Sequence, residues 1–149
     1  MTRNVLVEDS NFDQGDDGFV FKAGRNRDAW RVGRPTENIE ARNCRFKTTS
    51  SLIGVGSELS GGVRNVYVHD CTVETACNLF YVKTNRRRGG FVENIRMENV
   101  QCGLASQVFA VDMGGRGRAS TSTGTRFSRS ASCAWRMCAS AAYRTFPRA

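Results

Sequence analysis

The sequence has little of what marks several common classes of protein. Only one of its 149 residues is histidine, and no apolar run is long enough to span a membrane. It has no N-terminal signal peptide pattern and begins in the middle of a strand pattern, as a fragment would. Its six cysteines have no spacing typical of a metal site. The sequence therefore predicts no membrane span, no metal and no cofactor.

What the chain does have is a frame that recurs four times, beginning at Asn4, Asn38, Asn65 and Asn94. Apolar residues occupy the second and fourth positions of each copy, and an Asp or Asn closes the strand. A period of two is typical of a strand with one buried face. A second apolar strand follows at one fixed offset, and its leading residues are Phe19, Ile53, Phe80 and Phe109.

Copies that keep one register indicate a solenoid, because a single copy cannot bury its apolar face alone. Short strands without helical periodicity favour an all-β parallel β-helix of about four coils. The leading residues of the second strands should stack as an interior ladder, and the four leading Asn residues should bond along the stack. Cys44 and Cys71 share one position of consecutive copies, so we expect them to be small interior residues.

The repeats cover residues 1–113, and residues 114–149 differ in kind. This tail contains seven Arg and no Lys, Asp or Glu, so most of the formal charge of +8 lies there. Its composition predicts disorder, and an out-of-frame translation is an equal alternative. Nucleic-acid binding would rest on the tail alone, so we expect no nucleic acid as a partner of the folded part.

Asp16 and Asp17 stand side by side between Gly15 and Gly18, directly before a strand. The glycines permit backbone conformations that could turn both carboxyl groups toward one surface. Adjacent carboxyls are suited to general acid and base work. The alternative is a polar turn with two solvated aspartates.

Four segments together resemble glycoside hydrolase family 28, the polygalacturonases and their relatives. They are the Asp pair, residues 23–39, residues 56–66 and residues 81–91. The resemblance covers about residues 1–112. It implies a right-handed parallel β-helix of the pectin-lyase-like type. It also implies hydrolysis of α-1,4 galacturonosyl bonds in pectin with inversion, in a secreted or periplasmic enzyme that is monomeric when complete.

The resemblance also assigns roles to single residues. Asp16 would match the general acid, Asp17 a carboxylate that activates water, and Lys83 a lysine that grips a substrate carboxylate. Repeat geometry directs Lys83 outward and stacks Ser50 one coil from Asp16, so a row of Asp16, Asp17, Ser50 and Lys83 is expected on one flank.

The chain departs from the family pattern at three places. The Asn-Thr-Asp motif, which supplies a further aspartate, is absent. Thr49-Ser50-Ser51 replaces Gly-His-Gly, and Tyr81 stands where Arg is expected. Tyr81 could stack on a sugar but cannot pair with a carboxylate. His69 is expected to be a plain surface residue away from this row.

Arginines gather in two loops that follow second strands. They are Arg25, Arg27, Arg31 and Arg34 in one loop and Arg86, Arg87 and Arg88 in the other. Guanidinium groups bind carboxylates in pairs of hydrogen bonds, which suits an acidic polysaccharide such as pectin. Alternatively, they solvate the loops and pair with Glu37, Asp28 or Glu93. Trp30 is either a sugar platform or an anchor for its loop. A noncatalytic β-helix that binds acidic polysaccharide is the alternative function.

Overall fold

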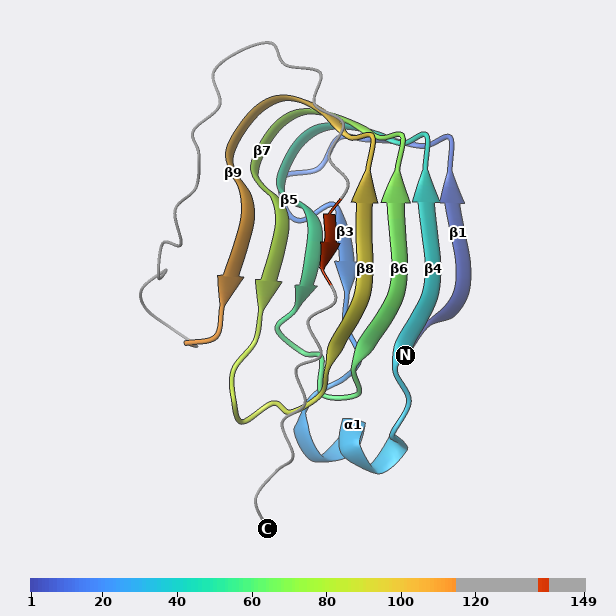
Figure 1. Cartoon of the computed structure of the whole chain (residues 1–149), viewed down its shortest axis with the longest axis vertical. Coiled ribbons are helices and arrows are strands. Elements are labelled where there is room, and N and C mark those ends of the chain that lie inside the picture. Colours follow the sequence, from blue (N-terminus) through green and yellow to red (C-terminus); the bar gives the residue numbers. More distant parts are fainter. Residues whose placement is uncertain (115–136, 140–149) are drawn as a thin grey trace.

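The computed structural model describes residues 1–114 and 137–139 of the chain. Two parallel sheets face each other across the core (Figure 1). The first contains β1 (Arg3–Glu8), β4 (Thr36–Arg42), β6 (Val63–His69) and β8 (Val92–Glu98), and the second contains β2 (Asn11–Phe12), β3 (Phe19–Phe21), β5 (Arg45–Gly56), β7 (Thr72–Lys83) and β9 (Gln101–Asp112). Each coil supplies one layer of both sheets, so the predicted all-β parallel β-helix is confirmed.

The interior ladder has the predicted register. Phe19 pairs with Ile53, Ile53 with Phe80, and Phe80 with Phe109, always in neighbouring parallel strands. Ile53 is fully buried, and the rings of Phe80 and Phe109 stack with their centroids 5.2 Å apart. The side chains of Cys44 and Cys71 are also buried, as expected, and both thiols are free. The fixed offset in the sequence therefore corresponds to one layer of the core.

The Asn ladder is also confirmed. The Nδ2 groups of Asn38, Asn65 and Asn94 each donate to the Oδ1 of the preceding ladder residue, at 3.1, 3.1 and 2.9 Å. All four ladder residues have left-handed backbone conformations, with φ between 51° and 57°. Asn tolerates this region better than most residues do. The same residue type therefore bends the chain at each coil and links the coils together.

Glu37 in β4 is a charged residue that the coil buries. Its side chain is only 10% exposed and lies 2.6 Å from Arg64 and 3.5 Å from Arg3. The hydrogen bond from Arg64, followed by weaker effects of Arg64 and Arg3, holds the pKa of Glu37 below its ordinary value. Glu37 thus pairs with Arg3 and Arg64. The alternative that it pairs with the loop arginines is wrong.

The sequence patterns did not predict the helix α1 (Asn26–Val32), which interrupts the strands between β3 and β4. It ends at Gly33, which has a φ of 61° and donates its N–H to the carbonyl of Ala29. A left-handed glycine is a common helix end. Figure 1 shows α1 at the same end of the molecule as the loops that follow β5 and β7. No helix in the described part of the chain is long and apolar enough to cross a membrane.

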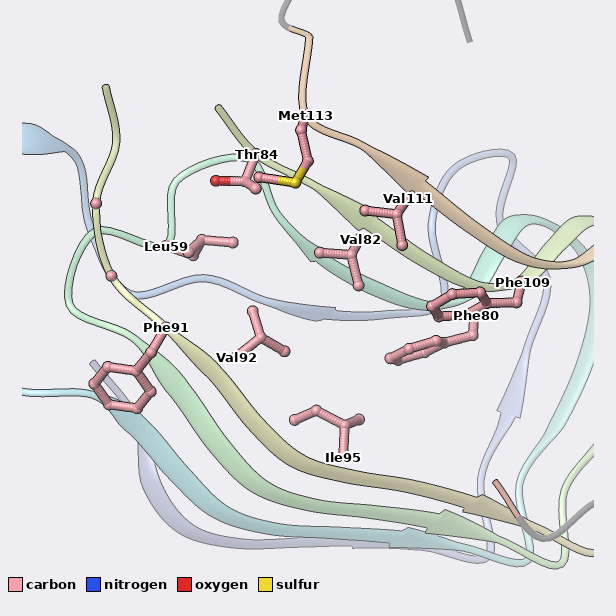
Figure 2. Close-up of a pocket in the computed structure, with 12 residues that line it drawn as sticks. Leu59, Phe80, Val82, Thr84, Phe91, Val92, Ile95, Phe109, Val111 and Met113 are labelled. Atoms are coloured by element: carbon pink, nitrogen blue, oxygen red, sulfur yellow. The ribbon is translucent and has the colours of Figure 1, made fainter. Parts of the chain in front are cut away.

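The core opens at the end formed by the last coil. A cavity of about 190 Å³ lies there. Figure 2 shows the side chains that line it. Its lining is almost wholly apolar and comes mainly from the last two coils, including Phe80, Val82, Phe109, Val111 and Met113. Because these side chains belong to the interior ladders, the cavity is the end of the core that the described residues leave unfilled. It is separate from the charged row on the outside.

Most of the tail lies outside the described residues. This applies to Cys133 and to the expectation of a disordered or out-of-frame segment, which stays a prediction. The exception is β10 (Met137–Ala139), which pairs antiparallel with residues 95–97 of β8. These three residues therefore form a strand, contrary to the disorder that the composition predicts for the tail.

Candidate active site

The candidate site lies on the outer surface near the end of the second sheet. Asp17 precedes β3, and Lys83 ends β7. The Nζ of Lys83 donates to the Oδ2 of Asp17 at 2.7 Å, although the residues belong to the first and third coils. The Asp17 side chain is 8% exposed and that of Lys83 is 33% exposed. Two of the predicted residues are thus brought into direct contact.

Gly54 makes this contact possible, and sequence reasoning missed it. Gly54 lies in the second coil, in register between Val20 and Tyr81. A Cβ at Gly54 would lie 3.2 Å from the Oδ2 of Asp17. Any larger side chain would therefore fill the space that the carboxylate occupies. The signal in the sequence was that Gly54 is the one glycine at this position of the repeat, where the other three coils have Val20, Tyr81 and Ala110.

Asp16 lies beside this pair and is exposed to solvent. Its Oδ1 accepts the backbone N–H of Asp17 at 2.8 Å. Its carbonyl oxygen accepts the N–H of Ser50 at 3.1 Å and the hydroxyl of Thr49 at 2.9 Å. The second coil therefore holds the backbone of Asp16 in place. Ser50 does lie one coil from Asp16, as predicted, and it contacts the main chain there.

Tyr81 extends the row on the third coil. The Nζ of Lys83 lies 5.4 Å from the centroid of the Tyr81 ring, within the range of a cation–π contact. Burial, and after it the nearby Asp112 carboxylate, raises the pKa of Tyr81. Tyr81 therefore stays a neutral phenol, and one side of its ring faces the lysine ammonium.

The two arginine loops meet beside the row. The indole N–H of Trp30 donates to the carbonyl of Arg88 at 3.0 Å, which ties α1 to the loop after β7. This bond favours the anchoring interpretation of Trp30. The pKa of Glu58 is lowered, chiefly by the hydrogen bond from Lys22. Arg88 and Arg25, one from each loop, contribute weakly to the same shift, so both loops carry positive charge near Glu58.

Most of the loop arginines remain available to a ligand. In the described segments, no ion pair involves Arg25, Arg31 or Arg34, and all three are exposed. Their charges therefore face solvent instead of a protein carboxylate. This leaves the interpretation as an anionic-ligand surface open.

His69 lies away from the row, as predicted, but it is not a plain surface residue. Its ring stacks on Tyr67 with centroids 4.2 Å apart and its side chain is only 14% exposed. Its Nδ1 lies 2.5 Å from Asp70 and its Nε2 lies 3.2 Å from Glu40. The alternating pattern correctly placed His69 outside the core but could not show the neighbours that cover it.

The row offers groups that can act as acids and bases. Across residues 1–114 and 137–139, no cluster of His, Cys, Asp and Glu side chains is arranged to hold a metal ion. The row instead combines an exposed carboxyl, a nearly buried carboxylate and an ammonium group. Such a set can transfer protons and bind a negatively charged ligand.

Comparison with known proteins gives the same family throughout. The profile of glycosyl hydrolases family 28 matches residues 1–123. A probable polygalacturonase of Vitis vinifera is 31% identical over 93 residues, which are 62% of this chain and 19% of that protein. An endo-polygalacturonase of Pectobacterium carotovorum subsp. carotovorum is 28% identical over 111 residues, which are 74% of this chain and 26% of that protein.

A solved structure agrees with these relatives. The crystal structure of a hyperthermoactive exopolygalacturonase from Thermotoga maritima matches with a TM-score of 0.58 and 28% identity, over 74% of this chain and 30% of that one. The chain spans less than a third of the length of each of these proteins. The family profile, the relatives and the shared fold agree, and the chain belongs to glycosyl hydrolase family 28.

Proposed function

We propose that this chain supplies the acid and base coils of a polygalacturonase-type glycoside hydrolase. Its substrate is pectin, and the reaction is hydrolysis of α-1,4 galacturonosyl bonds with inversion. Membership of the family supports the reaction class. The observation that carries the proposal is the ion pair between Asp17 and Lys83, with the exposed Asp16 next to it.

The two carboxyl groups of the row, those of Asp16 and Asp17, each take one step of this reaction. Asp16 donates a proton to the glycosidic oxygen as the bond to the anomeric carbon breaks. Asp17 accepts a proton from the water that attacks the opposite face of the sugar. An inverting site keeps its acid and base about 6.5 to 9.5 Å apart so that the water fits between them. The exposed position of Asp16 and the nearly buried one of Asp17 suit these separate roles.

Lys83 has a double role in this proposal. Its ammonium carries three hydrogens, and the contact with Asp17 uses one of them. The others are free to bind the carboxylate of a galacturonate unit. Ser50 and Tyr81 flank the same surface, and Arg25, Arg31 and Arg34 extend its positive charge along the polysaccharide.

The proposal includes where the protein acts. Pectin is a polymer outside the cytoplasm, so we place the complete protein in the secreted or periplasmic class, where it would act as a monomer. The partner is an acidic polysaccharide or oligogalacturonate.

The variant Asp16→Asn tests this function. We expect the full chain to release reducing ends from polygalacturonic acid, and Asp16→Asn to lower that rate at least about 100-fold, since general acid catalysis contributes about this much. Binding of oligogalacturonate should persist. Asp13→Asn is the matched control, because Asp13 is exposed and its substitution removes the same charge. In the part of the chain that the structure describes, its ion pair is with Lys47.

Two results would contradict the proposal. If Asp16→Asn retained the activity of Asp13→Asn, Asp16 would not be the acid. If the unmodified chain bound oligogalacturonate without cleaving it, the noncatalytic β-helix that binds acidic polysaccharide would replace the enzyme.

A further inference from the structure

Asp112 is a carboxylate next to the row, and it has no part in the proposed bond cleavage. It is the last residue of β9 and lies in register with Lys83 on the neighbouring coil. Its Oδ1 accepts the backbone N–H of Gly114 at 2.8 Å, and its carbonyl accepts the N–H of Thr84 at 2.8 Å. Both the main chain and one carboxylate oxygen are therefore held, so this group is fixed at the surface.

Asp112 carries a charge that the row does not balance. The nearest ammonium in the register is that of Lys83, and it contacts Asp17 on the opposite side. Among the residues that the structure describes, no cation forms an ion pair with Asp112. The second strand of the fourth coil, β9, thus ends in a fixed negative charge.

Tyr81 stands beside this charge. Tyr81 lies in register with Ala110, and Asp112 follows Ala110 by two residues on the same face of β9. Asp112 also contributes, after burial, to the raised pKa of Tyr81. A phenol ring provides an apolar face and a hydroxyl for a sugar. A carboxylate provides acceptors for sugar hydroxyl groups but repels another carboxylate. Together they suit a sugar unit that carries no charge.

We propose that Asp112 and Tyr81 form a sugar subsite that prefers an uncharged unit, such as a methyl-esterified galacturonate, over a free uronate. The subsite adjoins the one at Lys83, which takes the charged unit. The inference rests on the proposed function, because it assumes that a pectin chain lies along the row. Asp112 is a specificity-determining residue in this scheme and takes no part in the bond cleavage.

Binding of two oligosaccharides of equal length tests the subsite. The probes are fully de-esterified and fully methyl-esterified oligogalacturonate, titrated into the full chain by calorimetry. We expect Asp112→Asn to tighten binding of the acidic oligomer about tenfold, because a fixed like charge is removed. Binding of the esterified oligomer should stay within about twofold. Asp112→Ser provides a second variant, and retention of the thermal unfolding midpoint checks that both are folded.

Glu74→Gln is the matched control, since Glu74 is exposed on the same sheet and its loss changes the net charge equally. If Asp112→Asn changed the ratio of the two affinities no more than Glu74→Gln does, the subsite would be wrong and the proposed function would stand. If the unmodified chain bound neither oligomer, the proposed function itself would fail, and the subsite with it.

Discussion

At the scale of single residues, two lysine–aspartate pairs differ mainly in burial. Lys83 bonds to Asp17, whose side chain is 8% exposed, and Lys47 bonds to Asp13, whose side chain is 70% exposed. An exposed pair stabilises a protein little, because water and salt screen it. A carboxylate left unpaired in a nearly buried place costs considerably more.

We therefore expect Lys83→Met to lower the free energy of unfolding by about 2 kcal/mol, a value below that for fully buried pairs because Lys83 is partly exposed. Lys47→Met should lower it by less than about 0.5 kcal/mol. Urea unfolding of the two variants at neutral pH measures both. Equal losses of unfolding free energy in the two variants would show that the burial of Asp17 does not increase the contribution of Lys83 to stability.

Residue patterns predicted the row but not its contacts. The strand period placed Lys83 outside the core, and the repeat placed Ser50 one coil from Asp16; the structure has both arrangements. The bond between Lys83 and Asp17 spans two coils, and it depends on an empty position at Gly54. The period of the sequence predicts on which face of the sheet a side chain lies, but it does not predict which residue of another coil that side chain contacts.

At the scale of elements, the Asn ladder links each strand of the first sheet to the next strand by a side-chain hydrogen bond. Asn65 takes part in two ladder bonds and has a φ of 55°. Ala at this position would lose both bonds and would also disfavour the left-handed backbone. Gly would lose the bonds but would accept the backbone.

Asn65→Ala should consequently lower the free energy of unfolding by about 2 kcal/mol, and Asn65→Gly by about 1 kcal/mol. Thermal or urea unfolding of both variants gives these values. The prediction fails if both variants are as stable as the unmodified chain, since neither the bonds nor the backbone would then matter.

Strands could be predicted from the sequence because four copies repeat the same pattern, whereas α1 occurs once. Its seven residues are too few to show a helical period, and its N-terminal boundary at Arg25 has no side-chain cap. Gly33 after Arg31 was the available signal, because a basic last turn followed by glycine is typical of a helix end. An element without repeats or caps is difficult to predict from local sequence.

At the scale of the whole molecule, the core ends in an apolar cavity at the last coil (Figure 2). A dye that fluoresces in apolar surroundings, such as anilinonaphthalene sulfonate, should bind in this cavity. Val111→Asp should reduce the fluorescence several-fold, because it places a charge in the lining. Ala110→Asp, one residue away on the outer row, should not.

Fluorescence that persisted in Val111→Asp, or was lost equally in Ala110→Asp, would place the dye elsewhere. The outcome concerns the whole molecule. If the dye reaches the cavity, the last coil exposes apolar core residues that a further coil could cover.

The Asn ladder also has a direction. Every amide nitrogen donates toward the first coil, so Asn4 presents an amide nitrogen at one end and Asn94 an amide oxygen at the other. A coil such as residues 38–64 is therefore complementary to a copy of itself, like a monomer unit in a polymer. Duplication of one coil in the gene would lengthen the row outside by one step. In such a protein, the length of polysaccharide that the surface can hold is set by the number of coils.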